Sequence, residues 1–479
     1  MPGQSSRIRW NSLFALLSQA IRLLTNFFVF VGVARFYGPE AFGQFTTAHS
    51  FSSIFLLFAD FGFDTLLATE IARHRERAEE LARRYFSLKI VFALGATAAM
   101  LLLPIFKSMS PSTTILTQIF SFYVLFASMN NFFFALFKGF EQFYHETKIS
   151  FSINLTLLVI IVVLGAVHAP LAVIAAAFVG TRIIGLVIGL GIASRISGVG
   201  AFRFSLEGWR DVWENVLIFG SYALFGNLFF LMDTMLLAFL RGDREVGIYQ
   251  SVFKIVVLVL IIPDIAINTM LPVLSRLNKT NEHQWQGLGR LLNKTLCLLS
   301  LPVSLILFVY PEQVLGFVYG PNLFGEAIPI LRLFSIIVFI RYGVEAYALM
   351  LTTSRRQKSR TLIVFAGTLF NVLLNLFVIP RYGPWGAAAV SLATNLLVAI
   401  GYITLSKMPF FKWTFGLRNS ILFAISAVLC YCLLNLQMIS MWYGILLVTA
   451  LYAAGFYFIG YTRDEWAVIF NREHGAIAI

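Results

Sequence analysis

Charged residues are scarce in this sequence. Asp, Glu, Lys and Arg make up 12% of the 479 residues, whereas hydrophobic residues make up 59%. A soluble domain has about 25% charged and roughly 45–50% apolar residues, so this chain has too little charge to cover the surface of a water-soluble protein of its size. The composition therefore excludes a soluble enzyme and a disordered chain. It also excludes a β-barrel, whose strands alternate between apolar and polar residues.

Motifs of enzyme chemistry are missing as well. The three cysteines lie inside apolar runs without C-x-x-C spacing, which gives neither a disulfide framework nor a metal site. The chain has no G-x-x-x-x-G-K-[ST], H-E-x-x-H or G-x-S-x-G. Its six histidines are scattered, and we interpret His49 and His168 as structural. We therefore expect no catalytic residue, no metal and no cofactor.

Long apolar runs dominate the sequence and predict an all-α polytopic membrane protein, because a crossing takes about 20 apolar residues. The fourteen predicted helices span about 13–34, 42–67, 86–106, 115–137, 150–167, 170–193, 216–240, 246–274, 291–310, 328–352, 361–379, 385–405, 419–436 and 441–461. The first is expected to be retained rather than cleaved as a signal peptide, because no A-x-A-like site follows it.

Lys and Arg fall mainly on one side of this arrangement. With the N-terminus in the cytoplasm, the cytoplasmic segments hold 24 of them and the opposite segments hold 5. The positive-inside rule therefore places both termini in the cytoplasm. The net charge of +13 indicates contact with anionic membrane lipid rather than nucleic acid.

Two ungapped offsets relate the halves of the chain. An offset of 204 sets GPEAFGQF (38–45) on GDREVGIY (242–249), and an offset of 214 sets Pro170 on Pro384. Transporters are often built from two such halves. We predict an N-lobe of helices 1–6 and a C-lobe of helices 7–12 as two pseudo-symmetric units. The predicted parts are the N-lobe (1–193), a cytoplasmic linker (194–215), the C-lobe (216–405), and helices 13 and 14 with a cytoplasmic tail (406–479).

Three stretches resemble a known family. They are RLLTNFFVFVGVARFYGPEAFGQF, FADFGFDTLLATEIAR and LFNVLLNLFVIPRYGPWGAAAVSLATN. These are similar to the Wzx-type polysaccharide flippases, a branch of the multidrug/oligosaccharidyl-lipid/polysaccharide exporter superfamily. The resemblance covers about 10–405, and the helix count fits this branch better than the 12-helix drug exporters.

The resemblance implies a function at the bacterial inner membrane. The protein would move an oligosaccharide linked to undecaprenyl pyrophosphate by alternating access, coupled to an ion gradient, for O-antigen or another surface polysaccharide. The resemblance also implies two protein partners, a polysaccharide polymerase and a chain-length regulator. The alternatives are a lipid II flippase, a multidrug exporter and a membrane glycan polymerase or ligase. The last is disfavoured because the longest outward loop, 311–327, has no His, Lys or Arg.

Charges inside the apolar runs are the candidate functional residues, because a charge at the bilayer centre costs at least about 2.5–3.5 kcal/mol on insertion scales. The candidate substrate-binding residues are Arg22, Lys254, Gln19, Asn26, Arg182, Arg332 and Arg341. Arg22 is the first choice for a pyrophosphate, because a guanidinium matches phosphate oxygens and no acid lies within one turn of it. Lys254 is the second. For each base the alternative is an ion pair that only joins helices, which we favour for Arg341 with Glu345.

Asp264 and Asp60 are the candidate ion-coupling residues, and the 204 offset relates them. Asp264 follows Pro263, which would kink the helix and free backbone carbonyls near the acid. We favour a proton-carrying role for Asp264 and a structural pair for Asp60. Lys89, close to a predicted cytoplasmic helix end, is expected to snorkel to the interface.

Overall fold

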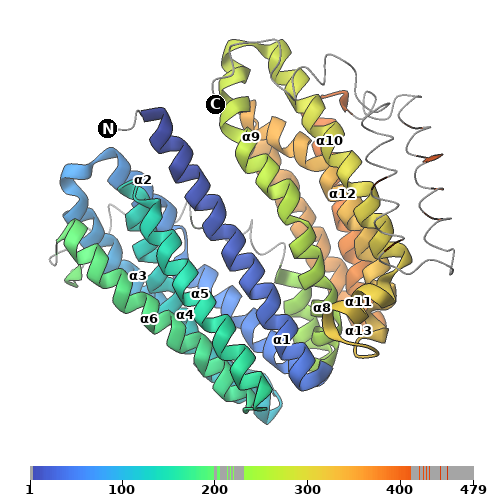
Figure 1. The fold of residues 1–479 in the computed structure, drawn as a ribbon, viewed down its shortest axis with the longest axis horizontal. Helices are drawn as coiled ribbons and strands as arrows, with labels where there is room; N and C mark the ends of the chain where they lie inside the picture. Colours follow the sequence, from blue (N-terminus) through green and yellow to red (C-terminus); the bar gives the residue numbers. More distant parts are fainter. Residues whose placement is uncertain are drawn as a thin grey trace. The chain divides into compact units, whose positions relative to one another are not determined.

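The computed structural model describes residues 4–198 and 231–410, together with isolated residues and short pieces between 202 and 220 and between 420 and 450. Every regular element in this part of the chain is a helix (Figure 1). The α-helices are α1 (Gln4–Asp60), α2 (Phe63–Arg73), α3 (Ala78–Phe106), α4 (Pro111–Gly139), α5 (Phe143–Ala166), α6 (Leu171–Ser197), α8 (Asp243–Val259), α9 (Ile261–Thr280), α10 (Glu282–Val309), α11 (Pro311–Tyr319), α12 (Ile328–Thr353) and α13 (Gln357–Ser406). Short 3₁₀ turns precede α3 and α12.

The predicted all-α membrane architecture is confirmed. Nine helical stretches among the described residues are long and apolar enough to cross a membrane. Some of them hold two predicted helices each, because two helices follow each other across a kink at a single non-helical glycine, as in Leu17–Arg73 at Gly38 and Gln357–Ser406 at Gly383. The predicted helix at 216–240 is described as Leu231–Leu240. The predicted helices at 419–436 and 441–461, the cytoplasmic tail and most of the 194–215 linker lie outside the described residues, and fourteen stays a prediction.

The bends fall where the repeat aligns the sequence. Gly38 interrupts α1 with a φ of 80°, and its partner at the 204 offset, Gly242, has a φ of 113° directly before α8. A positive φ is open to glycine because it lacks a Cβ. At the 214 offset, Pro170 directly precedes α6 and Pro384 follows the bend at Gly383 in α13. The equivalent positions therefore lie at a bend or at the start of a helix in both halves.

The described chain divides into two compact units. The first consists of Met1–Lys254 and Thr368–Ala387, and the second of Ile255–Gly367 and Ala388–Ile479, in each case for the residues described. These units differ from the predicted parts, whose boundaries at 193, 215 and 405 stay predictions. In the first unit α1 packs against α3, α4 and α5, and α4 packs against α6. In the second, α12 packs against α9, α10 and α11.

Two helices of the first unit cross at a pair of glycines. A Cβ on Gly247 in α8 would lie 2.9 Å from the Cα of Gly43 and 2.9 Å from the carbonyl oxygen of Pro39. Conversely, a Cβ on Gly43 would overlap the carbonyl group of Asp243. Gly43 and Gly247 are equivalent in the 204 offset. The local pseudo-symmetry therefore brings the same position of each repeat into direct backbone contact.

Several connections that the charge count places on the outer side meet near this crossing. Thr113 Oγ1 donates a hydrogen bond to Asp243 Oδ2 at 2.6 Å, and Arg241 Nη1 donates to the carbonyl of Pro380 at 3.2 Å. Lys107, just after α3, has its ammonium 4.6 Å from the ring centre of Phe239. Burial lowers the pKa of Lys107 from its ordinary value, with Asp243 opposing this shift. These contacts join segments that are distant in sequence at one end of the first unit.

Candidate substrate-binding site

Arg22 lies in the first half of α1 and carries the clearest of the predicted basic groups. Its side chain is 38% exposed, and Asn26, one turn further along, is exposed as well. Gln19 is half-buried. The predicted face of α1 is therefore formed, and Arg22 stands at its centre.

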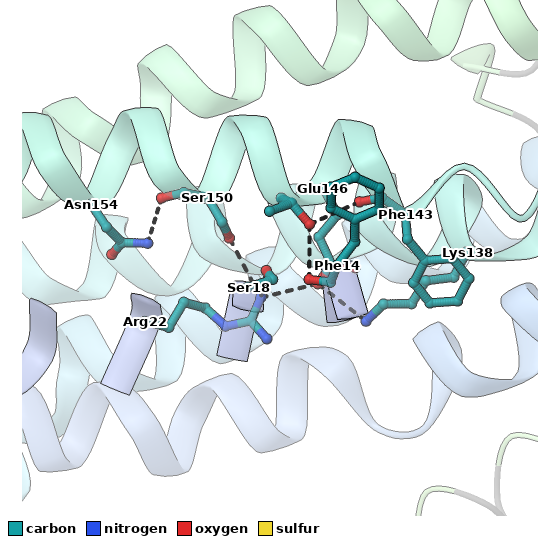
Figure 2. Close-up of polar contacts among 9 residues, drawn as sticks. Phe14, Ser18, Arg22, Lys138, Phe143, Glu146, Ser150 and Asn154 are labelled. Atoms are coloured by element: carbon teal, nitrogen blue, oxygen red, sulfur yellow. Dashed lines mark hydrogen bonds and ion pairs between the residues drawn. The ribbon is translucent and has the colours of Figure 1, made fainter. Parts of the chain in front are cut away.

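A carboxylate from another helix reaches Arg22. Arg22 Nη1 lies 3.0 Å from Oε1 of Glu146, in the first turn of α5, and Glu146 is only 2% exposed. The same nitrogen donates to Ser18 Oγ at 3.2 Å and to Ser150 Oγ at 3.5 Å. Figure 2 shows the guanidinium pointing from α1 toward these α5 side chains. Arg22 is thus ion-paired, which its sequence neighbours do not reveal.

Glu146 has a second basic partner. Lys138 Nζ, near the end of α4, lies 3.3 Å from the same Oε1 atom. The other carboxylate oxygen, Oε2, is buried and has no hydrogen-bond partner among the described residues. We call Arg22, Lys138, Glu146 and Ser150 the Arg22 cluster (Figure 2). Two positive charges here face one negative charge, so the cluster carries a surplus of one positive charge.

The backbone around the cluster is fixed by a contact between α1 and α5. Thr147 Oγ1 on α5 donates to the carbonyl of Phe14 on α1 at 2.9 Å, and within α5 Asn154 Nδ2 donates to the carbonyl of Ser150 at 2.7 Å. Glu146 lies at the N-terminus of α5, where the helix dipole stabilises a negative charge.

Lys254, on α8, belongs to a second basic group, whose other members lie on other helices. Its Nζ atom is 3.7 Å from the ring centre of Phe30 on α1, a cation–π contact. Arg182 on α6 stacks over Tyr123, with its Cζ 5.5 Å from the ring centre. Both positive charges act on His49, whose ring packs edge-on against Phe30 at 4.9 Å. We call these five residues the Lys254 cluster.

The Lys254 cluster holds cations without acids. No ion pair within the described parts of the chain involves Lys254 or Arg182, and the buried Nε of Arg182 has no hydrogen-bond partner there. Phe30 is eight residues from Arg22 on α1, which is about 12 Å along a helix. One helix therefore links the two basic clusters.

The remaining predicted bases lie in the second unit. Arg341 Nη2 is 3.2 Å from Glu345 Oε1, four residues along α12, so the expected ion pair is present. Arg332 is exposed on α12. The structure therefore brings Lys254 and Arg182 together and places Arg22 with acids and bases that the sequence did not single out.

The two candidate coupling acids have different surroundings. Asp60 ends α1 and lies 3.0 Å from Lys89 Nζ, and it accepts hydrogen bonds from Ser128 Oγ at 2.7 Å and Asn131 Nδ2 at 2.8 Å. Lys89 also pairs with Asp64 and is completely buried. The expectation that Lys89 snorkels to the interface is therefore wrong, because two acids at the break between α1 and α2 hold it inside.

Asp264 is exposed in the first turn of α9, with Pro263 buried beside it. The helix breaks at Leu260, between α8 and α9, as the proline predicted. The carbonyl of Val259, at the break, accepts a hydrogen bond from the Tyr342 hydroxyl at 2.7 Å. The break thus frees a carbonyl, and a tyrosine of α12 satisfies it.

Lys138 and Glu146 are the site residues that sequence reasoning missed. Both fall in or beside a predicted cytoplasmic connection, where charges are expected on topological grounds alone. An acid in the first turn of α5 was the one signal available. It indicates a helix start rather than a partner for Arg22.

Comparison with known proteins identifies relatives of the chain. Residues 8–278 match the family described as polysaccharide biosynthesis protein. The probable flippase AglR of Haloferax volcanii is 28% identical over 218 residues, which are 44% of this chain and 42% of the relative. The chain thus aligns with about two-fifths of the length of this curated relative.

Solved structures share the fold. The lipid II flippase MurJ in an inward closed conformation gives a TM-score of 0.72 at 13% identity, covering 96% of this chain and 99% of MurJ. An inward-facing multidrug resistance MATE family transporter of the MOP superfamily gives 0.64 at 14% identity, covering 82% and 96%. A MOP superfamily transporter from Pyrococcus furiosus, for which reverse polarity of the binding pocket suggests a different function, gives 0.59 at 15% identity, covering 85% and 96%.

Proposed function

Since the chain belongs to the polysaccharide biosynthesis protein family, we propose that it is a flippase that moves a lipid-linked oligosaccharide across the membrane. The carrier in this proposal is undecaprenyl pyrophosphate, and the membrane is the bacterial inner membrane. The product serves O-antigen or another surface polysaccharide, with a polymerase and a chain-length regulator as downstream partners. The probable flippase from Haloferax volcanii supports the transport class.

The surplus of positive charge in the first unit carries this proposal. A pyrophosphate is a compact anion, and a guanidinium can bind it through two parallel hydrogen bonds. The Arg22 cluster has two cations to one carboxylate, and Lys254 lies against an aromatic ring with no acid in the ion pairs described. A site for cationic drugs would be expected to have the opposite sign. The charge pattern therefore favours an anionic head group over a cationic drug.

The two clusters suggest a path for the head group. The Arg22 cluster lies next to the predicted cytoplasmic connection 138–149, and the Lys254 cluster lies two turns deeper along α1. The pyrophosphate would bind first at Arg22 and then come within reach of Lys254 as the lobes alternate their access. Coupling to an ion gradient would use Asp264, beside the break between α8 and α9, whereas Asp60, the other candidate acid, is ion-paired with the buried Lys89 and would have the structural role.

A deletion strain tests the proposal. Loss of the gene should cause lipid-linked oligosaccharide to accumulate and surface glycan to disappear, and the wild-type gene should restore both. Accumulation of lipid II instead would indicate a lipid II flippase, and drug sensitivity without glycan loss would indicate an exporter. Single repeat units that reach the surface but stay unpolymerised would indicate a polymerase.

Complementation with Arg22 variants then tests the site. Arg22→Ala should fail to restore surface glycan at normal protein level, because Glu146 keeps Lys138 as a partner and no buried charge is left uncompensated. Arg22→Lys should restore it partly, because it keeps the charge and loses the planar fork. Full function of Arg22→Ala at matched expression would contradict the proposed role of Arg22.

A further inference from the structure

Glu146 is placed to compete with a bound anion. Its Oε1 atom lies 3.0 Å from Arg22 Nη1 and 3.3 Å from Lys138 Nζ, so both cations use one oxygen. The side chain is 2% exposed, and its Oε2 atom has no hydrogen-bond partner among the residues described. A carboxylate held only through one oxygen by two cations can lose either cation and still keep a partner.

Arg22 has free capacity on its open side. All three of the side-chain hydrogen bonds that it makes with described residues leave from Nη1, toward Ser18, Glu146 and Ser150. With 38% exposure, its Nη2 and Nε groups remain available to a ligand. A phosphate bound there would lie close to the Glu146 carboxylate, and two like charges at such a distance repel each other.

We infer that Glu146 is a built-in counter-anion of Arg22. It pairs with Arg22 in the empty site, loses this partner when the pyrophosphate head group binds Arg22, and pairs with Arg22 again when the head group leaves. The inference rests on the proposed function and assigns Glu146 as a positioning residue that acts through Arg22. In the empty site Glu146 neutralises Arg22. When the anion arrives, Lys138 retains the carboxylate, and Arg22 turns to the phosphate. The competition keeps the head group from binding too tightly to leave.

This role predicts that replacing Glu146 strengthens the binding of a pyrophosphate instead of weakening it. Glu146→Gln keeps the size of the side chain and an acceptor oxygen but removes the competing charge. Binding of a pyrophosphate should therefore tighten by about tenfold or more, since close charge pairs are coupled by at least about 1.5 kcal/mol. Transport should slow at the same time, because release becomes slower. A residue that only supports the fold would weaken binding when it is replaced.

The experiment measures binding of farnesyl pyrophosphate to the purified full-length protein, with farnesol as the uncharged reference ligand. Wild type should bind the pyrophosphate, Arg22→Ala should bind it at least tenfold more weakly, and Glu146→Gln should bind it more tightly. The double variant should bind like Arg22→Ala, which shows that Glu146 acts through Arg22. Glu146→Asp retracts the carboxylate and should tighten binding by less, which keeps the test open if Glu146→Gln does not fold.

Glu80 offers a matched control. Like Glu146 it bridges two cations, here Arg77 at 3.1 Å and Arg84 at 2.6 Å, but at the more exposed start of α3. Glu80→Gln should leave pyrophosphate binding unchanged. Weaker or unchanged binding in both Glu146 variants, with Arg22→Ala still impaired, would overturn the counter-anion role and leave the proposed site intact. Equal binding by wild type and Arg22→Ala would instead contradict the proposed site itself.

Discussion

Gly247→Ala should destabilise the protein through the crossing of α1 and α8. The added Cβ would lie 2.9 Å from both the Cα of Gly43 and the carbonyl oxygen of Pro39. Both are backbone atoms, so no side-chain rotation can relieve the overlap. Overpacking of this kind costs about 1–3 kcal/mol, and the better helix propensity of alanine returns at most about 1 kcal/mol. We expect a net loss of about 1–2 kcal/mol in the free energy of unfolding.

Gly95→Ala is the matched control, for which we expect the opposite change in the free energy of unfolding. Gly95 is also inside a helix, α3, but a Cβ there would meet nothing within 4 Å. Alanine should therefore stabilise this helix by about 0.5–1 kcal/mol. In thermal unfolding of the purified variants, Gly247→Ala should lower Tm by about 1–2 °C and Gly95→Ala should raise it by about 0.5–1 °C, because the entropy of unfolding of a chain of this size is on the order of 1 kcal/mol/K. Similar shifts of the same sign in both variants would refute close backbone contact at Gly247.

Three further predictions concern charges and topology. Lys89→Met should lower the amount of protein in the membrane, because removing one partner from a buried ion cluster costs about 3–5 kcal/mol. Neutralising Asp60 and Asp64 together with Lys89 should restore the amount of protein, and equal protein levels in all variants would refute the buried cluster. Asp264→Asn should insert normally yet lose transport driven by a proton gradient, and a wild-type rate with wild-type pH dependence would eliminate the proton-carrying role. Single cysteines at 352–360 should resist a membrane-impermeant maleimide in intact cells, whereas cysteines at 311–327 should react; the reverse pattern would contradict the predicted orientation.

The sequence predicts the helices well because their signal is local. Apolar runs, glycine at Gly38 and proline at Pro384 mark where helices extend and bend, and each acts through its own residue type. The repeat offset even pairs Gly43 with Gly247, two positions that touch in the structure. These features need no knowledge of the tertiary packing.

The site is less predictable because its charges pair between helices. Arg22 has no acid within one turn, yet Glu146 reaches it from 124 positions away. Lys89 lies near a predicted helix end, and only the break between α1 and α2 shows that Asp60 and Asp64 enclose it. Arg341 and Glu345 were predictable because their partners are four residues apart on one helix. Pairing across helices depends on packing angles that a single sequence does not display.

Flipping by the reconstituted full-length protein is a direct test of the proposed transport of a lipid-linked oligosaccharide. A fluorescent polyprenyl-pyrophosphate-linked disaccharide would be placed in both leaflets of proteoliposomes, and an impermeant quencher would report its movement to the outer leaflet. We expect movement by wild type and movement about tenfold slower or more by Arg22→Ala, at equal protein content. Equal rates for the two proteins, or no movement by wild type, would contradict it.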